Sequence, residues 1–428
     1  MLTQPYTHGL WARTAPPAPA LTALADHLRC DVAIIGAGYT GLSAALHLAQ
    51  AGVDVIVLEA EEIGFGGSGR NVGLVNAGMW IMPDDVAEVL GKKYQERLLH
   101  ELSEAPNLVF ELIDRHKISC EAVRNGTLHC AVGEGGLREI NRRGEQWLKR
   151  GADVEILDRP ATAAKLGSSA YQGALLDRRA GTIQPLAYAR GLAKAAHDNG
   201  ARIFSQTSVL SARAAPERLW RLETPGGSVM ANWIIVAGNA YIQGPWSALR
   251  QELVSLPYFN CATTPLSTQA LEEILPERQG AWDTNAVLSS FRLDDAGRLI
   301  FGSVGALRFG GQKIHKEWAQ RAISRIFPQL PCTSIEFSWF GRIGMTKDHV
   351  PRFHKLDRNV IGFQGYNGRG IGTGTVFGRA LAGFIVGKLN EGSLPLPVNS
   401  LSPHPLRRLK STIYEAGAQL LHFGAARL

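Results

Sequence analysis

The chain is poor in cysteine and lacks the patterns that bind metals. Its 428 residues include five cysteines, at positions 30, 120, 130, 261 and 332, with no Cys-x-x-Cys pair. An odd number of widely spaced cysteines argues against a disulfide framework, and the missing pairs argue against a zinc site. We therefore expect free thiols and no bound metal.

Long apolar runs are also absent. No stretch reaches the ~18 apolar residues that cross a bilayer, and the N-terminus shows no charged segment followed by an apolar one. These absences predict a cytoplasmic protein.

Positive charge is not concentrated anywhere, although the net charge is +7. The basic residues form only short clusters, such as Arg142-Arg143 and Arg407-Arg408. Nucleic-acid binding usually needs a basic stripe or a known module, so no nucleic-acid partner is expected. An anionic cofactor or substrate would use part of the surplus charge.

Glycine, by contrast, is abundant, with 47 residues. This abundance indicates many close backbone approaches and favours a nucleotide binder over a helical bundle. The length is sufficient for two domains with buried cores.

A βαβ unit stands near the N-terminus. Residues 31–35 are an apolar run typical of a strand buried on both faces, apolar residues then recur at helical spacing, and residues 53–58 form a second strand. The first turn reads Gly36-Ala-Gly-Tyr-Thr-Gly41, in which glycines permit the turn, the approach of a pyrophosphate and close helix packing. Glu59 ends the second strand, where a carboxylate binds ribose hydroxyls and repels a 2′-phosphate.

Three further glycine-rich segments extend this pattern. The loop 63–73 can wrap the pyrophosphate and ribityl chain that FAD has and nicotinamide cofactors lack. Residues 233–241 form an apolar strand ending in small residues. Residues 365–372 place a second helix N-terminus where it can face the electron-rich edge of a reduced flavin. Each segment alone is also compatible with a plain structural role, whereas together they favour FAD.

The remaining pattern gives a coarse map. An irregular arm covers residues 1–28 and ends in a short helical piece around Leu21 to Leu28. Helices are expected over residues 84–115, 137–150, 312–328 and 377–389. Strands are expected over residues 126–132, 202–211 and 229–236, with alternating strands and turns over 266–301.

In this order the motifs resemble the D-amino-acid oxidase family of flavoenzymes, from about residue 28 to residue 400. The resemblance is nearest to the bacterial γ-glutamylputrescine oxidase and L-pipecolate oxidase-like branch. It is carried by residues 30–52, 64–71, 173–186, 234–241 and 362–374, with Trp339, Gly341, Thr346, Asp348 and Pro351.

The resemblance implies an α/β (α+β) fold with a glutathione-reductase-type FAD-binding Rossmann domain and a second, β-sheet substrate domain. The expected FAD domain takes residues 28–105, 155–255 and 340–400. The expected substrate domain takes residues 106–154 and 256–339, and residues 401–428 form a C-terminal helical tail.

The resemblance also implies which residues touch FAD: Gly36, Gly38, Tyr39, Thr40, Gly41, Glu59, Ala60, Gly67, Ser68, Arg70, Asn71, Val72, Gly73, Val209, Ala237, Gly238, Gly341, Gly370, Ile371, Gly372 and Thr373. Two positions depart from the family pattern, because Val72 replaces a glycine and Arg369 replaces a histidine. Gly344 and Met345 stand where covalent relatives carry a flavin-linked cysteine, and Cys332 lies well upstream. FAD is therefore expected to be non-covalent.

Four residues are candidates for catalysis or substrate binding. Tyr258 lies on a segment that the family places in the substrate domain, and Arg342 and Arg369 suit a bidentate carboxylate clamp. His349 follows the Thr-x-Asp motif and is a candidate base, with a structural histidine as the alternative. Further candidates for the pocket, each with a structural alternative, are Phe259, Arg292, Trp339 and Tyr366.

The expected reaction moves a hydride from the substrate α-carbon to flavin N5 and gives an imine. The substrate is expected to be a small secondary or cyclic amino acid such as L-pipecolate, with γ-glutamylputrescine as the alternative and a non-catalytic flavoprotein as a remote one. Residues 71–80 depart from the γ-glutamylputrescine pattern and tilt the choice to the amino acid. The electron acceptor is oxygen, a quinone or an electron carrier.

The C-terminal tail carries apolar residues at helical spacing, with basic residues between them. The apolar ones are Leu406, Leu409, Ile413, Ala416 and Leu420, and the basic ones are Arg407, Arg408 and Lys410. The pattern predicts an amphipathic helix docked on the protein, and the alternative is a weak contact with a membrane surface.

Overall fold

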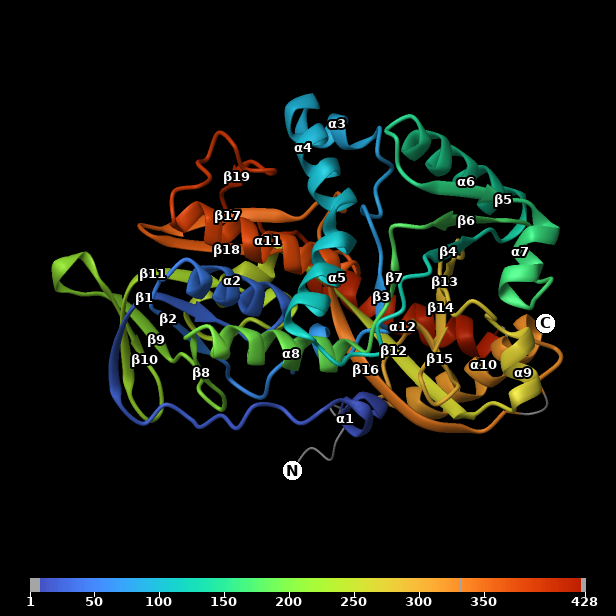
Figure 1. The fold of residues 1–428 in the computed structure, drawn as a ribbon, viewed down its shortest axis with the longest axis horizontal. Helices are drawn as coiled ribbons and strands as arrows, with labels where there is room; N and C mark the ends of the chain where they lie inside the picture. The colour runs from blue at the N-terminus through green and yellow to red at the C-terminus, as the bar shows by residue number, and fades with distance from the viewer. Residues whose placement is uncertain (1–7, 331–332, 425–428) are drawn as a thin grey trace.

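The computed structural model describes residues 8–330 and 333–424, and in this part of the chain two large sheets build the two halves of the molecule (Figure 1). The first sheet contains β1 (His27–Ile35), β2 (Val55–Leu58), β8 (Arg202–Phe204), β9 (Ser211–Ala214), β10 (Trp220–Glu223), β11 (Ser228–Val236), β17 (Arg352–Asp357), β18 (Val360–Gln364) and β19 (Val398–Asn399). Its order is β19-β17-β18-β11-β1-β2-β8, with β10 and β9 attached beside β11.

The second sheet is the substrate-side sheet. It contains β4 (Thr127–Cys130), β5 (Val154–Leu157), β6 (Ala174–Asp177), β12 (Val254–Pro265), β13 (Gly280–Asp283), β14 (Ser289–Leu293), β15 (Arg298–Val304) and β16 (Ile335–Met345). Its order is β16-β12-β15-β14-β13-β4-β6-β5. Between the halves, β3 (Leu74–Val75) pairs with β7 (Gly181–Thr182).

Helices cover both halves. The α-helices are α1 (Leu10–Thr14), α2 (Tyr39–Gln50), α3 (Val86–Leu90), α4 (Lys92–Ser103), α5 (Ala105–His116), α6 (Gly133–Leu148), α7 (Arg159–Leu166), α8 (Pro185–Asp198), α9 (Thr268–Glu273), α10 (Gly311–Ile326), α11 (Gly370–Ile385) and α12 (Arg407–Gly424). Short 3₁₀ helices are η1 (Gly67–Gly69), η2 (Pro216–Arg218), η3 (Asn239–Tyr241) and η4 (Gly244–Glu252).

The centre of the first sheet is parallel and fully buried. Strand β1 lies between β11 and β2, with Ile34 opposite both Ile235 and Val57, and these three side chains have no exposed surface. Burial on both faces explains why β1 reads as a continuous apolar run. Helix α2 packs against α11 and α8 on one face of this sheet.

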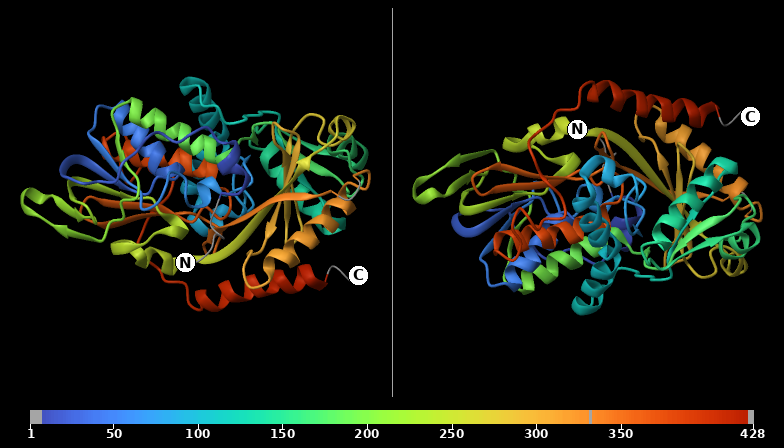
Figure 2. Two further views of the ribbon diagram at one scale, coloured as in Figure 1. Left: turned by 90° about the horizontal axis from the view of Figure 1, so that it is seen from below. Right: turned by 90° about the horizontal axis from the view of Figure 1, so that it is seen from above.

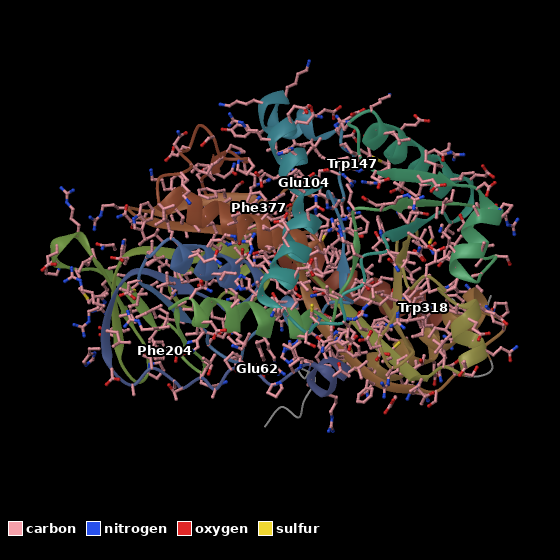
Figure 3. All side chains as sticks on the ribbon, viewed as in Figure 1. Glu62, Glu104, Trp147, Phe204, Trp318 and Phe377 are labelled. Carbon is pink, nitrogen blue, oxygen red and sulfur yellow. The ribbon has the colours of Figure 1, made fainter. Side chains whose placement is uncertain are left out.

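The substrate-side sheet is mostly antiparallel, and its longest strand, β12, lies next to the edge strand β16. Tyr258 of β12 lies opposite Gly341 of β16, while β13 and β4 run parallel with Trp282 opposite His129. Figure 3 places Phe204 of β8 and Phe377 of α11 in one half of the molecule, and Trp318 of α10 in the other.

Five expectations need correction. Residues 21–26 form no helix, because that stretch runs extended into β1, and the short helix of the arm is α1. Strands β5 and β6 belong to the second sheet, since β6 pairs with β4 and β5, so the chain returns to the half built on the first sheet only after residue 177 rather than at 155. The helical region 84–115 is three helices, and α11 begins at Gly370 rather than near Phe377. Strand β16 also runs across the expected boundary at 339/340.

None of the described helices combines the length and the hydropathy that a bilayer-crossing helix needs.

Candidate active site

One cavity of about 770 Å³ joins the two halves. Its wall includes the end of β1 and β2 on one side, and residues of β12, β13, β14, β15 and β16 on the other. The first part of the cavity therefore lies at the carboxyl ends of β1 and β2, and we call it the dinucleotide end. The second part is a chamber against the substrate-side sheet, and we call it the chamber end.

The dinucleotide end is shaped by backbone that tolerates no side chain. Gly36 has φ of +106°, and a Cβ atom on Gly41 would lie 2.0 Å from the carbonyl oxygen of Gly36. A Cβ on Gly38 would meet Ser68 Oγ at 2.9 Å. These contacts fix the turn, so helix α2 starts at the cavity with no capping side chain and no acid in its first turn. Such an N-terminus offers an anion its N–H groups and its positive dipole end.

Glu59 stands at the end of β2 with its carboxylate held by backbone donors. The Ala37 N–H donates to Oε2 at 2.6 Å, and the Glu61 N–H donates to Oε1 at 3.0 Å. Burial raises the pKa of this carboxyl, and the two backbone hydrogen bonds oppose that shift. The fixed carboxylate is well suited to accept hydrogen bonds from a ribose.

The loop 64–73 folds back over α2. The Tyr39 N–H donates to Ser68 Oγ at 3.1 Å, and the Tyr39 hydroxyl donates to the Ser68 carbonyl at 2.5 Å. Asn71 Nδ2 donates to the carbonyls of Gly67 and Ser68. The Arg70 guanidinium lies 4.4 Å from the centre of the Phe65 ring. The loop is thus pinned along one side of the cavity.

Helix α11 brings a second N-terminus to the same cavity. It begins at Gly370 after Arg369, without a capping side chain and without an acid in its first turn. The cavity wall thus combines two helix N-termini, the glycine turn and the Glu59 carboxylate. This set suits an extended dinucleotide with a pyrophosphate, so the residues present fit FAD.

The chamber end is lined by large aromatic side chains around an arginine. The Trp80 and Trp282 rings meet edge to face, with centroids 5.0 Å apart. The Arg369 guanidinium lies 5.5 Å from the Trp80 ring and 4.9 Å from the Trp282 ring, and Nη1 donates to the Ala77 carbonyl at 2.6 Å. Burial, followed by the charge of Arg143, lowers the pKa of Arg369 to about 9. The positive charge of Arg369 attracts anions into the chamber and repels ammonium groups.

A second layer supports this chamber. His129 stacks on Trp282 with centroids 3.4 Å apart, and burial lowers the pKa of His129 well below its usual range. Arg143 of α6 is almost fully buried and donates to the carbonyls of Met79 and Trp80. Arg143 and Arg369 therefore both donate hydrogen bonds to backbone carbonyls of the loop that carries Trp80.

The structure brings most of the expected residues to the cavity wall. Those on the wall are Gly36, Gly38, Tyr39, Thr40, Glu59, Ala60, Gly67, Ser68, Arg70, Asn71, Val72, Val209, Ala237, Gly238, Gly341, Gly370 and Ile371, together with Tyr258, Arg342, His349, Tyr366 and Arg369. Gly41, Gly73, Gly372 and Thr373 are not on the wall. Gly41 and Gly73 act as spacers, because a Cβ on Gly73 would lie 2.1 Å from the Ile183 carbonyl oxygen.

The four catalytic candidates differ in their surroundings. The Tyr258 hydroxyl shares a 2.6 Å hydrogen bond with Ser290 Oγ, and burial raises the pKa of this phenol. Arg342 is half-buried at the wall. His349 is exposed and sits in a turn with φ of +58°, so it lies at the rim rather than inside the chamber.

Three pocket candidates serve the core instead. Trp339 is buried against Trp11 with ring centroids 5.3 Å apart, and its indole donates to the Arg70 carbonyl. Arg292 is buried and donates to the carbonyls of Val72 and Ile183. Phe259 follows Tyr258 on β12 and therefore faces the opposite side, where it stacks on His315.

Sequence reasoning missed Trp80, Trp282 and Arg143. Trp282 lies in a short buried strand and Arg143 in a basic pair on a helix. No local signal separates them from core or surface residues. Of the cysteines, Cys30, Cys120, Cys130 and Cys261 are buried, and Cys332 lies outside the described residues.

Known proteins resemble the chain over most of its length. The family described as FAD dependent oxidoreductase (DAO) matches residues 31–383. A γ-glutamylputrescine oxidoreductase of Escherichia coli K12 is 34% identical over 394 residues, which is 89% of each chain. A probable oxidoreductase, OrdL, of Rhizobium meliloti is 30% identical over 88% of each chain.

Solved structures share the fold. Glycine oxidase from Geobacillus kaustophilus has a TM-score of 0.68 at 21% identity and covers 85% of this chain and 96% of its own. L-proline dehydrogenase from P. horikoshii has a TM-score of 0.69 at 16% identity, covering 94% of this chain and 98% of its own.

Proposed function

The chain belongs to the DAO family of FAD-dependent oxidoreductases, which act on amines and amino acids, and on that premise we propose that it oxidises a C–N bond of an amine of the γ-glutamylputrescine class. The observation that carries the reaction class is the single cavity that joins the dinucleotide edge to the aromatic chamber. The substrate class is supported by the 34% identity to a γ-glutamylputrescine oxidoreductase over 89% of both chains. This identity to a γ-glutamylputrescine oxidoreductase is stronger support than the sequence of residues 71–80, which favoured pipecolate.

When bound, FAD supplies the acceptor for two electrons and a proton equivalent from the substrate carbon. The residues expected to hold it are Gly36, Gly38, Glu59, Ser68 and the start of α11. The cysteines on the described part of the chain are buried and none is on the cavity wall, which supports non-covalent binding.

The chamber residues orient the amine and exclude water. Trp80 and Trp282 provide an apolar wall, and their contact closes the chamber on that side. The positive charge of Arg369 disfavours an ammonium ion in the chamber and so favours the neutral amine, whose lone pair assists oxidation. Tyr258 stays protonated and offers its hydroxyl as a hydrogen-bond partner.

Pipecolate stays a second candidate because of Arg369. An α-carboxylate in the chamber would find the half-buried Arg369 guanidinium on the wall. A γ-glutamyl amine carries its carboxylate far from the reacting carbon, so the two substrates would use this charge differently.

The test is the visible spectrum of the purified protein before and after anaerobic addition of γ-glutamylputrescine, putrescine, L-pipecolate and L-proline. We expect bleaching of the flavin at the lowest concentration with γ-glutamylputrescine. Bleaching by pipecolate alone would transfer the assignment to the amino acid. A yellow protein that none of them reduces would leave the fold intact and refute the proposed substrate class.

The electron acceptor is oxygen or a quinone-type carrier. Hydrogen peroxide formation under air, compared with turnover on a soluble quinone analogue, distinguishes these two.

A further inference from the structure

Helix α12 docks on the protein through its polar face. His422 and Ala418 are its buried residues, and His422 Nδ1 lies 2.7 Å from His315 Nδ1 of α10. The His422 ring also stacks on Trp318, with centroids 3.7 Å apart. Closer to the start of the helix, Ser411 Oγ accepts a hydrogen bond from the Ser255 N–H of β12. The docked face is therefore fixed by specific partners.

The apolar stripe of the same helix points away from the protein. Leu409 is 54% exposed, Ile413 55% and Leu420 71%. At 100° per residue these side chains fall in one stripe, opposite the face that carries Ser411, Ala418 and His422. A helix normally turns such a stripe to the core, and a continuous exposed one marks an interaction surface.

The stripe is longer than these three residues. Phe423 is exposed near the end of α12, and Phe309, which is 86% exposed, stands beside the helix. Its neighbour Arg308 forms an ion pair with Glu415 and accepts a hydrogen bond from Gln419 through its carbonyl. Figure 2 shows helix α12, coloured red, at the outer edge of the molecule in both views.

The exposed charges of α12 beside the apolar stripe are positive. Glu415 is the only acid within residues 407–424, and Arg308 pairs with it at the docked side. Arg408 and Lys410 are exposed on the two flanks of the stripe. The outward surface thus combines apolar side chains with cations, which is the pattern of a helix lying in the headgroup region of an anionic bilayer.

We propose that α12, with Phe309 beside it, is an interfacial anchor that binds the surface of an anionic lipid membrane. The helix lies parallel to the membrane, inserts Leu409, Ile413 and Leu420, and sets Arg408 and Lys410 against lipid phosphates. A second copy of the chain is a poorer occupant, because the same helix on that copy offers Arg408 and Lys410 no acid other than Glu415, which pairs with Arg308. The proposal does not depend on which amine is oxidised.

The geometry explains how an anchor can coexist with activity. Helix α12 contacts β12 on the side of Phe259, whose ring lies 6.0 Å from that of His422. Tyr258, the preceding residue, lines the cavity from the other side of the strand. The membrane would therefore lie behind the substrate-side sheet.

The test is co-sedimentation of the holoenzyme with vesicles of phosphatidylcholine alone and of phosphatidylcholine with one quarter phosphatidylglycerol. We expect binding to the anionic vesicles, weaker binding at raised salt, and at least a tenfold loss in the triple variant Leu409→Gln, Ile413→Gln, Leu420→Gln. The variant Arg408→Gln, Lys410→Gln should lose the preference for anionic lipid. A control with Val89→Gln and Leu148→Gln, exposed apolar residues on α3 and α6, should bind as the original chain does.

Flavin absorbance and turnover with a soluble acceptor should stay unchanged in all three variants, which shows that the fold is kept. Equal binding by the original chain and the triple variant, or no binding by either, would overturn the proposal. So would a dimer seen by light scattering that the triple variant converts to a monomer, because the stripe would then serve a second copy.

Discussion

At its dinucleotide end the cavity is shaped by backbone, whereas at its chamber end it is shaped by large side chains. Gly36 has a φ of +106°, a Cβ on Gly41 would lie 2.0 Å from the Gly36 carbonyl oxygen, and the nearby Glu59 carboxylate is held by backbone amides. The chamber instead places the Arg369 guanidinium beside the contacting rings of Trp80 and Trp282, with His129 stacked on Trp282. The dinucleotide end is suited to the part of the cofactor that is the same for every substrate. The side chains of the chamber end can differ between substrates without disturbing the glycine turn.

The largest effect should come from filling the space at the dinucleotide end. In Gly41→Ala the new Cβ would lie 2.0 Å from the Gly36 carbonyl oxygen, so helix and strand must separate. We expect a protein without bound flavin or an insoluble one, measured as the ratio of absorbance at 450 nm to that at 280 nm. Gly135→Ala in α6, where nothing lies within 4 Å, is the matched control and should keep full flavin content. Normal flavin in Gly41→Ala would show that this end is not fixed by backbone contact.

A second effect concerns an acid beside the chamber. Burial raises the pKa of Asp283 to about 6 from 3.8, against hydrogen bonds from the N–H groups of Ser289 and Asn285. The native carboxyl holds its proton where the unfolded one has lost it, so this stabilisation is full below about pH 3.8 and is lost as the pH rises through about 6. Asp283→Asn stays neutral and should be more stable at pH 8, by up to about 3 kcal/mol.

The measurement is the Tm of both proteins from pH 4 to pH 8. The difference should shrink toward pH 4. A constant difference at all pH values would mean that Asp283 does not titrate in this range.

A third effect tests the arginine of the chamber. Arg369→Met keeps an unbranched side chain beside the two indoles and removes its charge. We expect a loss of about 10- to 100-fold in kcat/KM, because a hydrogen bond to a charged group contributes about 1.5–3 kcal/mol. Flavin content should stay normal. Arg379→Met removes a half-buried ion pair between α11 and Glu101 of α4 and should leave kcat/KM unchanged. Loss of flavin in Arg369→Met would place this residue at the dinucleotide end.

The smallest effect should come from Tyr258→Phe. The change removes the hydroxyl that bonds Ser290 at 2.6 Å and keeps the ring on the wall. Because burial raises the pKa of the phenol, it does not titrate near neutral pH, and kcat/KM should fall less than about tenfold. The pH profile of kcat/KM decides, since loss of an acidic limb in the variant would mean that Tyr258 acts as a proton acceptor.

Helices α11 and α12 show what the spacing of apolar residues in the sequence predicts and what it does not. Helix α11 is apolar over most of its surface, and the glycine-rich segment before it correctly placed its N-terminus at the cavity. Helix α12 has a clear stripe and was expected to dock with it. The stripe faces outward because His422, Glu415 and Ser411 meet specific polar partners on α10, the preceding loop and β12. Periodicity reports that a stripe exists, but not which face finds complementary groups.

The sequence by itself determined the dinucleotide end, because its geometry depends on contacts between residues close in the chain. A glycine turn, the strand before it, the helix after it and Glu59 lie within about thirty residues. Only the tertiary structure decided the chamber, where Trp80, His129, Trp282 and Arg369 come from four distant segments. It also moved β5 and β6 to the substrate-side sheet, because strand pairing is a long-range choice that no local pattern encodes.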